Sequence, residues 1–166
     1  LLLTSLFLLD TLIFAVGYSV EAARLGNTIK SVEPTFFGWA VALICYPPFN
    51  IFVVQYIPWG ADDYALFGSA TTIMRIVLIS LLVLYVSASV ALGFKASNLT
   101  NRGIVTRFPY SILRHPAYIS KNMIWWITLL PVMNVKLALG LLFWSVIYFF
   151  RAVTEVAQTN GVPNAI

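Results

Sequence analysis

The chain has 166 residues, of which 60% are hydrophobic and 10% are charged, with a formal net charge of +4 and a mean hydropathy of +0.89. Soluble domains carry about 25% charged residues, and one of this length has too little interior to bury so much apolar surface. We therefore expect one integral membrane domain over 1–166. A single cysteine and a single histidine exclude an intrachain disulfide framework and a zinc cluster, so no metal site is expected, and no basic run indicates nucleic-acid binding.

Three apolar stretches within 1–94 are each long enough to be predicted as a transmembrane helix, which needs roughly 20 residues. They cover 1–20, about 35–57, and 76–94, which has no charged residue. The Pro-Pro pair at 47–48 is expected to kink or locally unwind the second, because proline lacks the amide donor of a helical residue. Asp10 in the first is expected to face the bundle or to be protonated.

The remaining chain contains a polar segment, 95–121, that is too hydrophilic to cross a membrane, and an apolar block, 122–150. Lys136 divides this block into two runs of 14 residues, and at 1.5 Å per residue each would reach only about 21 Å. We expect a helical hairpin over 122–155 that turns near 131–136. The alternative is one long tilted helix, which would make four spans. The predicted fold is all-α, a polytopic membrane bundle of about five transmembrane helices with the last two as a hairpin.

Charges in the connections predict the orientation of the bundle. The first connection, about 18–34, and the third, 95–121, contain Lys and Arg. The second, about 58–66, contains no Lys or Arg, and its charged residues are two Asp. The positive-inside rule then places the first and third connections in the cytoplasm, together with the residues after 150. The polar residues that could do chemistry are therefore expected on one side of the membrane.

Two groups of residues are candidates for a site. The segment 103–118 contains His115, whose backbone is restricted to extended conformations by the proline that follows it. Arg151 and Glu155 have i, i+4 spacing and therefore share one helix face. The simpler interpretations are a basic anchor on lipid phosphates for the segment and an exposed ion pair for the two charges.

These residues carry a resemblance to a known family. The run Arg-His-Pro-Ala-Tyr at 114–118, with Val105-Thr106 and Tyr110 before it and Arg151 and Thr154-Glu155 one hairpin later, resembles the isoprenylcysteine carboxyl methyltransferase family. The wider group of that family includes membrane phospholipid methyltransferases. The resemblance covers about 97–155, and the sequence departs from the family pattern at Phe108, where a glycine is usual, and at Val156, where a second acid is usual.

The resemblance implies a methyltransferase that uses S-adenosyl-L-methionine and acts on a lipophilic or lipidated acceptor at the cytoplasmic membrane face, first of all a carboxylate of an isoprenylcysteine-like molecule. It implies that 95–121 is the cofactor loop, that Arg151 faces the substrate carboxylate, that His115 binds the methionyl carboxylate, and that Tyr110 and Tyr118 pack on the adenine or approach the sulfonium. The cofactor contacts that it implies are Ile104, Val105, Tyr110, His115, Pro116, Ala117, Tyr118 and Glu155.

Three other functions remain open on the sequence. A phospholipid amine N-methyltransferase is the nearest, and an NADPH-dependent sterol-type reductase would share a similar helical site. The third is a non-enzymatic membrane scaffold whose basic loop holds anionic lipid. A hydrolytic triad is not expected, because the three aspartates are predicted either across the membrane or on the first span, away from His115, and no Gly-x-Gly-x-x-Gly motif is present.

Overall fold

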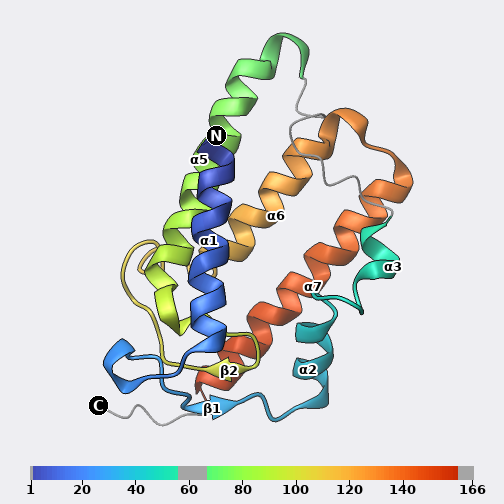
Figure 1. The fold of residues 1–166 in the computed structure, drawn as a ribbon. Coiled ribbons are helices and arrows are strands. Elements are labelled where there is room, and N and C mark those ends of the chain that lie inside the picture. Colours follow the sequence, from blue (N-terminus) through green and yellow to red (C-terminus); the bar gives the residue numbers. More distant parts are fainter. Residues whose placement is uncertain (1, 56–66, 161–166) are drawn as a thin grey trace.

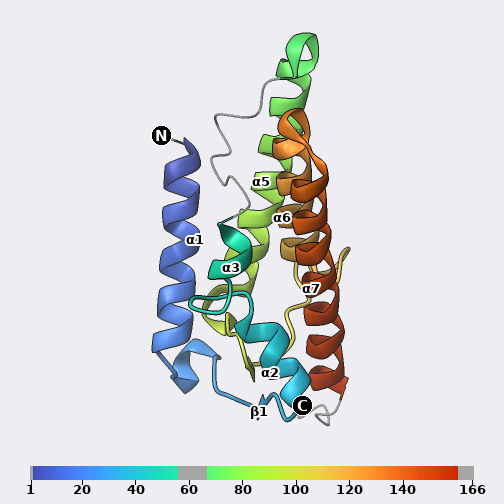
Figure 2. The ribbon, with the colours of Figure 1, turned by 90° about the vertical axis from the view of Figure 1, so that its right-hand side faces the viewer.

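The computed structural model describes residues 2–55 and 67–160, and most of them are helical, as the all-α prediction requires. Four longer helices run side by side (Figure 1), and the view in Figure 2 places α1 on one flank, α7 on the other, and α5 and α6 between them. The helices are α1 (Leu2–Ser19), α2 (Phe36–Leu43), α3 (Ile51–Val54), α5 (Thr71–Leu92), α6 (Pro116–Leu129) and α7 (Val135–Asn160).

The first and third predicted spans correspond to α1 and α5, but the second is not one helix. It is divided into α2 and α3, with the Pro-Pro pair at 47–48 in the non-helical stretch between them. The missing amide donors of the two prolines account for a complete break. Thr35 starts α2, because its hydroxyl accepts a hydrogen bond from the Gly38 amide at 3.0 Å.

The last two long helices form a hairpin whose turn includes a 3₁₀ segment at Leu130–Val132. This turn overlaps the predicted range 131–136, and the break excludes the alternative of one long tilted helix. The Asn134 side chain caps α7 by accepting from the Leu137 amide at 3.0 Å. The start of α6 at Pro116 corrects the boundary of the polar segment, because 116–121 is helical.

A short antiparallel strand pair, which the all-α prediction did not include, ties together two connections. β1 (Ser31–Val32) pairs with β2 (Thr100–Asn101). Backbone hydrogen bonds of 2.8 Å from Lys30 to Asn101 and from Glu33 to Leu99 extend the pairing. The first and third connections therefore lie at the same end of the bundle. The second connection, 58–66, lies outside the described residues.

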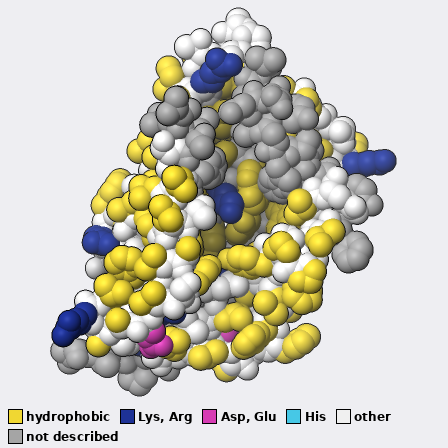
Figure 3. All heavy atoms as spheres, in the orientation of Figure 1, with side chains coloured by type: hydrophobic (Ala, Val, Ile, Leu, Met, Phe, Trp, Pro, Cys, Tyr) yellow, Lys and Arg dark blue, Asp and Glu magenta, His cyan; other side chains and the backbone are white. Residues whose placement is uncertain are grey.

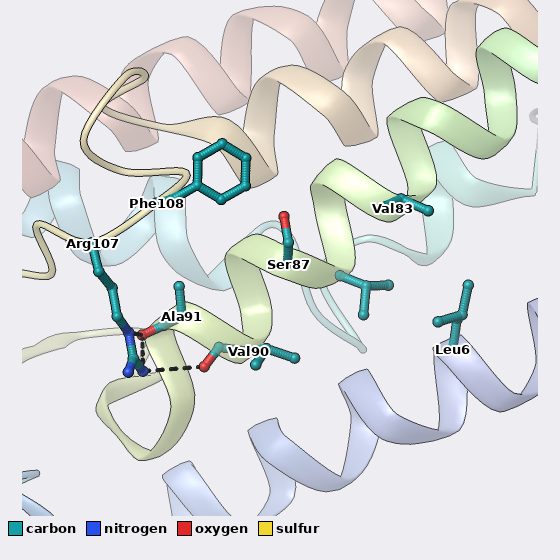
Figure 4. Close-up of a pocket in the computed structure, with 8 residues that line it drawn as sticks. Leu6, Val83, Ser87, Val90, Ala91, Arg107 and Phe108 are labelled. Carbon is teal, nitrogen blue, oxygen red and sulfur yellow. Dashed lines mark hydrogen bonds between the residues drawn. The ribbon is translucent and has the colours of Figure 1, made fainter.

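Two arginines of the polar segment hold it against the ends of helices. Arg107 donates to the Ala91 carbonyl at 2.7 and 3.0 Å and to the Val90 carbonyl at 3.3 Å, at the C-terminal end of α5 (Figure 4). Arg102 is buried and donates to the Gly17 carbonyl and, at 3.3 Å, to the Val20 carbonyl after α1. The last carbonyls of a helix lack intrahelical donors and carry partial negative charge, so cations stabilise them. These two arginines therefore fix the loop to α1 and α5.

By length and composition, two helical segments can cross a membrane: Gly68–Lys95 and Val135–Gln158. Leu8–Ser19 is a shorter apolar helical segment. Many large apolar side chains on these helices point outward, among them Leu12, Ile76 and Phe149, which are 54%, 62% and 64% exposed. Such outer surfaces are typical of helices that face lipid.

Candidate functional site

A cavity of about 850 Å³ lies where the polar segment meets the helices. Its wall includes residues of the polar segment, such as Tyr110, and residues of four helices: Phe14 of α1, Tyr85 of α5, Lys121 of α6 and Tyr148 of α7. Figure 3 shows a hollow on this face of the molecule, with a basic side chain inside it and hydrophobic side chains around it. The volume is within the range of about 300–1,000 Å³ that is typical of small-molecule sites.

The two candidate groups of the sequence meet at this cavity. His115 Nδ1 lies 3.6 Å from one carboxylate oxygen of Glu155, and Arg151 lies 3.0 Å from the other. Tyr118 donates its hydroxyl hydrogen to the same oxygen that Arg151 contacts. Two segments that are more than thirty residues apart along the chain, the start of α6 and the end of α7, thus share one carboxylate.

Local structure explains how each side chain of this cluster reaches its place. His115 is the residue before the first turn of α6, with φ −130° and ψ 61°, and Pro116 follows as the first helical residue, where a missing amide hydrogen costs nothing. Tyr118 follows three residues later, so its ring stacks on the His115 ring with centroids 5.8 Å apart and planes 7° apart. Arg151 and Glu155 share one face of α7, as their spacing predicts.

Arg151 uses four of its five N–H groups in hydrogen bonds to protein groups. It is buried, and its Nε and one terminal nitrogen each lie 3.2 Å from the Tyr118 hydroxyl oxygen. Its second terminal nitrogen donates to the Asn98 side chain, and Glu155 accepts the ion-pair hydrogen bond. A guanidinium has five N–H donors, so little capacity remains. In this conformation Arg151 positions Glu155 and Tyr118.

His115 presents an unsatisfied ring nitrogen. Its Nε2 is buried and has no hydrogen-bond partner among the described residues, although its Nδ1 faces Glu155. A buried polar atom without a partner costs about 1–3 kcal/mol. A ligand in the cavity could satisfy it, accepting from Nε2–H if the ring is protonated or donating to Nε2 if it is neutral.

Of the other predicted cofactor residues, four line the cavity and one does not. Ile104, Val105, Tyr110 and Ala117 line the same cavity as His115, Tyr118, Arg151 and Glu155. Pro116, in contrast, is fully buried at the start of α6 and is not part of the cavity wall. Its part in the site is therefore to start the helix. Phe108, which departs from the family pattern, is 60% exposed and borders a separate surface hollow on α5 (Figure 4).

Burial raises the pKa of the Tyr110 phenol to about 12, and the negative charge of Glu155 adds to this effect. Both causes disfavour the phenolate. Tyr110 therefore presents a protonated hydroxyl and an aromatic ring to the cavity at neutral pH, so it can act as a hydrogen-bond donor or a packing surface.

Among the cavity residues that sequence reasoning did not single out, Asn98 and Lys121 bear most directly on the charges of the site. Asn98 holds Arg151, and nothing in the local sequence distinguishes it from other polar loop residues. The sequence predicts Lys121 at the end of the polar segment, but it lies on α6 and lines the cavity. A lysine at the start of a long apolar helix was the available signal.

Comparison with known proteins adds no assignment: no protein-family model, curated protein or solved structure matches the chain.

Proposed function

We propose that this protein is a membrane methyltransferase that uses S-adenosyl-L-methionine and acts on a lipophilic acceptor, with the carboxylate of an isoprenylcysteine-like molecule as the first candidate. The observation that carries the proposal is the meeting of His115, Tyr118, Arg151 and Glu155 on one cavity wall. The same cavity continues between helices with apolar outer surfaces. A polar cofactor and a lipophilic acceptor can both reach such a site.

The donor set of the cavity fits this cofactor. The unsatisfied His115 Nε2 suits a carboxylate such as that of an amino-acid moiety, and the Glu155 carboxylate suits hydroxyl, ammonium or sulfonium groups. The rings of Tyr110 and Tyr118 suit an adenine or a sulfonium, because aromatic faces attract cations. The volume of about 850 Å³ leaves room for a second molecule.

When bound, S-adenosyl-L-methionine would supply a methyl group on a sulfonium, which an acceptor carboxylate oxygen takes as the S–C bond breaks, without loss of a proton. The protein therefore needs no general base for a carboxylate acceptor, which is already ionised at neutral pH. The tasks of its residues are to orient two molecules and to exclude water. Arg151 contributes by holding Glu155 and Tyr118 in fixed positions.

Several membrane spans and a cytoplasmic site are part of the proposal. They are supported by two helices of spanning length, by the apolar outer surfaces, and by the basic connections that lie at the site end. Membrane lipid then surrounds the helices, and the acceptor enters from the bilayer.

The direct test is calorimetric titration of the detergent-purified protein with S-adenosylhomocysteine. We expect saturable binding that weakens at least about tenfold in His115→Ala and in Glu155→Ala, since each loses a charged or polar ligand contact. Lys136→Ala, a change of an exposed lysine at the start of α7, is the matched control and should bind as the wild type does.

Other outcomes would select the other functions. Saturable binding of NADPH without binding of S-adenosylhomocysteine would indicate a reductase. No saturable heat with either compound would indicate a scaffold and overturn the proposal. If the cofactor binds, a rate of methyl transfer that rises with pH would favour a phospholipid amine, which must lose a proton, over a carboxylate, whose rate should be nearly flat above about pH 6.

A further inference from the structure

Lys121 is a second cationic group on the wall of the cavity. It lies on α6 six residues after His115, which is about 9 Å along the helix axis. Its ammonium nitrogen is 5.2 Å from the centre of the Trp125 ring and 6.0 Å from that of Tyr85. The aromatic rings of Tyr118, Tyr148 and Trp125 connect it to the charged cluster, with successive centroids 5.2 and 5.5 Å apart.

The Lys121 ammonium has no ion-pair or hydrogen-bond partner among residues 2–55 and 67–160, where the ion pairs join Glu155 to His115 and to Arg151. Asp10 is the acid whose charge acts most strongly on Lys121, but it lies beyond ion-pair distance. One oxygen of Asp10 accepts a 2.8 Å hydrogen bond from Tyr85. Aromatic faces attract an ammonium, yet they accept none of its three hydrogens in a conventional hydrogen bond. A cation in apolar surroundings is stabilised when an anion or strong acceptor approaches it.

Arg151 differs from Lys121 in this respect. Arg151 is bound to Glu155, Tyr118 and Asn98 through four of its five N–H groups, so an external anion that needs more than one hydrogen bond from Arg151 would require release of one of these partners. Lys121 would have to release no such partner.

We propose that Lys121 binds the anionic group of the lipophilic acceptor, a carboxylate or a phosphate, while the apolar part of the acceptor lies among the aromatic side chains of the cavity. The inference deepens the proposed function and rests on it for the presence of an acceptor in this cavity. It assigns recognition of the acceptor anion to Lys121 and leaves Arg151 with the positioning of Glu155 and Tyr118.

The test compares acid and ester forms of one probe, N-acetyl-S-farnesyl-cysteine and its methyl ester, in direct binding to the detergent-purified protein. We expect Lys121→Met to weaken binding of the acid at least about tenfold, because a charge-assisted hydrogen bond is lost, and to leave binding of the ester unchanged. Lys121→Arg should retain binding of the acid within about threefold. Lys136→Met is the matched control for removal of a lysine charge and should change neither.

A second arm distinguishes the source of the anion. Farnesyl phosphate and farnesol replace the acid and the ester, so that a loss confined to farnesyl phosphate in Lys121→Met would assign the subsite to a phosphate rather than a carboxylate. Equal losses for the charged and neutral probes, or no loss for either anion, would overturn the inference.

A purely structural role beside Asp10 gives a different pattern. In that case Lys121→Met lowers the unfolding temperature, the further change Asp10→Asn restores it, and the acid and ester probes respond alike, which contradicts the inference. Titration with S-adenosylhomocysteine separates the two proposals. If the wild type fails to bind it while the acid probe still depends on Lys121, the methyltransferase proposal fails and the anion subsite stands.

Discussion

The contact between α1 and α5 and the contact between α6 and α7 each enclose a carboxylate, and the two are stabilised differently. Asp10 accepts one hydrogen bond from Tyr85, and its other oxygen is buried without a partner among the described residues. Glu155 is contacted by Arg151, Tyr118 and His115. The Glu155 carboxylate therefore has two cationic or ionisable partners and a hydroxyl donor, whereas Asp10 has a single hydroxyl donor. The comparison indicates that the ion pairs of the site are formed where α6 meets α7, whereas Asp10 mainly orients Tyr85.

The largest effect is expected from Glu155→Gln. The amide removes the negative charge that Arg151 and His115 face, so the free energy of unfolding should fall by about 2 kcal/mol, reduced from the value for a fully buried pair because the Glu155 side chain is 35% exposed. Thermal unfolding in detergent measures it. Glu21→Gln, an exposed acid in the first connection, is the control and should change stability by less than about 0.5 kcal/mol. Equal effects of the two changes would remove the distinction between Glu155 and a surface acid.

A smaller effect on stability is expected when the other acid, Asp10, is replaced. Asp10→Asn keeps an oxygen that can accept from Tyr85 and removes a charge from apolar surroundings, so the free energy of unfolding should change by less than about 1 kcal/mol. The same thermal unfolding assay measures it, with Tyr85→Phe as the companion variant that removes the donor. A loss as large as that of Glu155→Gln would mean that the Asp10 charge is itself stabilising.

The smallest expected effect concerns the pKa of Tyr110, which a titration measures. Absorbance of phenolate in the wild type minus Tyr110→Phe should give a pKa of about 12 for Tyr110. This value is above the ordinary tyrosine pKa of 10.0, so between the two values the folded state keeps a proton that the unfolded state loses. The contribution of Tyr110 to stability is therefore present below pH 10 and declines as the pH rises through 12. Glu155→Gln should lower this pKa, since the charge of Glu155 is its second cause. An unchanged value would show that burial alone accounts for the shift.

Much of the local structure could be predicted from the sequence, because apolar run lengths, prolines and charge spacing act over a few residues. Lys136 indicated the hairpin, the pair at 47–48 indicated the break between α2 and α3, and the spacing of Arg151 and Glu155 placed them on one helix face. The strand pair and the helix-end contacts of Arg102 and Arg107 could not be predicted in this way, because their partners are 16 to 85 residues away along the chain.

The order of residues alone predicted where the long apolar helices α1, α5 and α7 lie and which polar segment contains the histidine and three arginines. Which charges are paired depends on how the helices pack. Arg151 and Lys121 are both cations flanking apolar helices in the sequence, yet Arg151 meets Asn98, Tyr118 and Glu155 while Lys121 meets aromatic rings and the cavity. The physical reason is that a hydrogen bond or ion pair depends on distances of 3 to 4 Å between atoms from different elements, and the packing of the helices determines those distances.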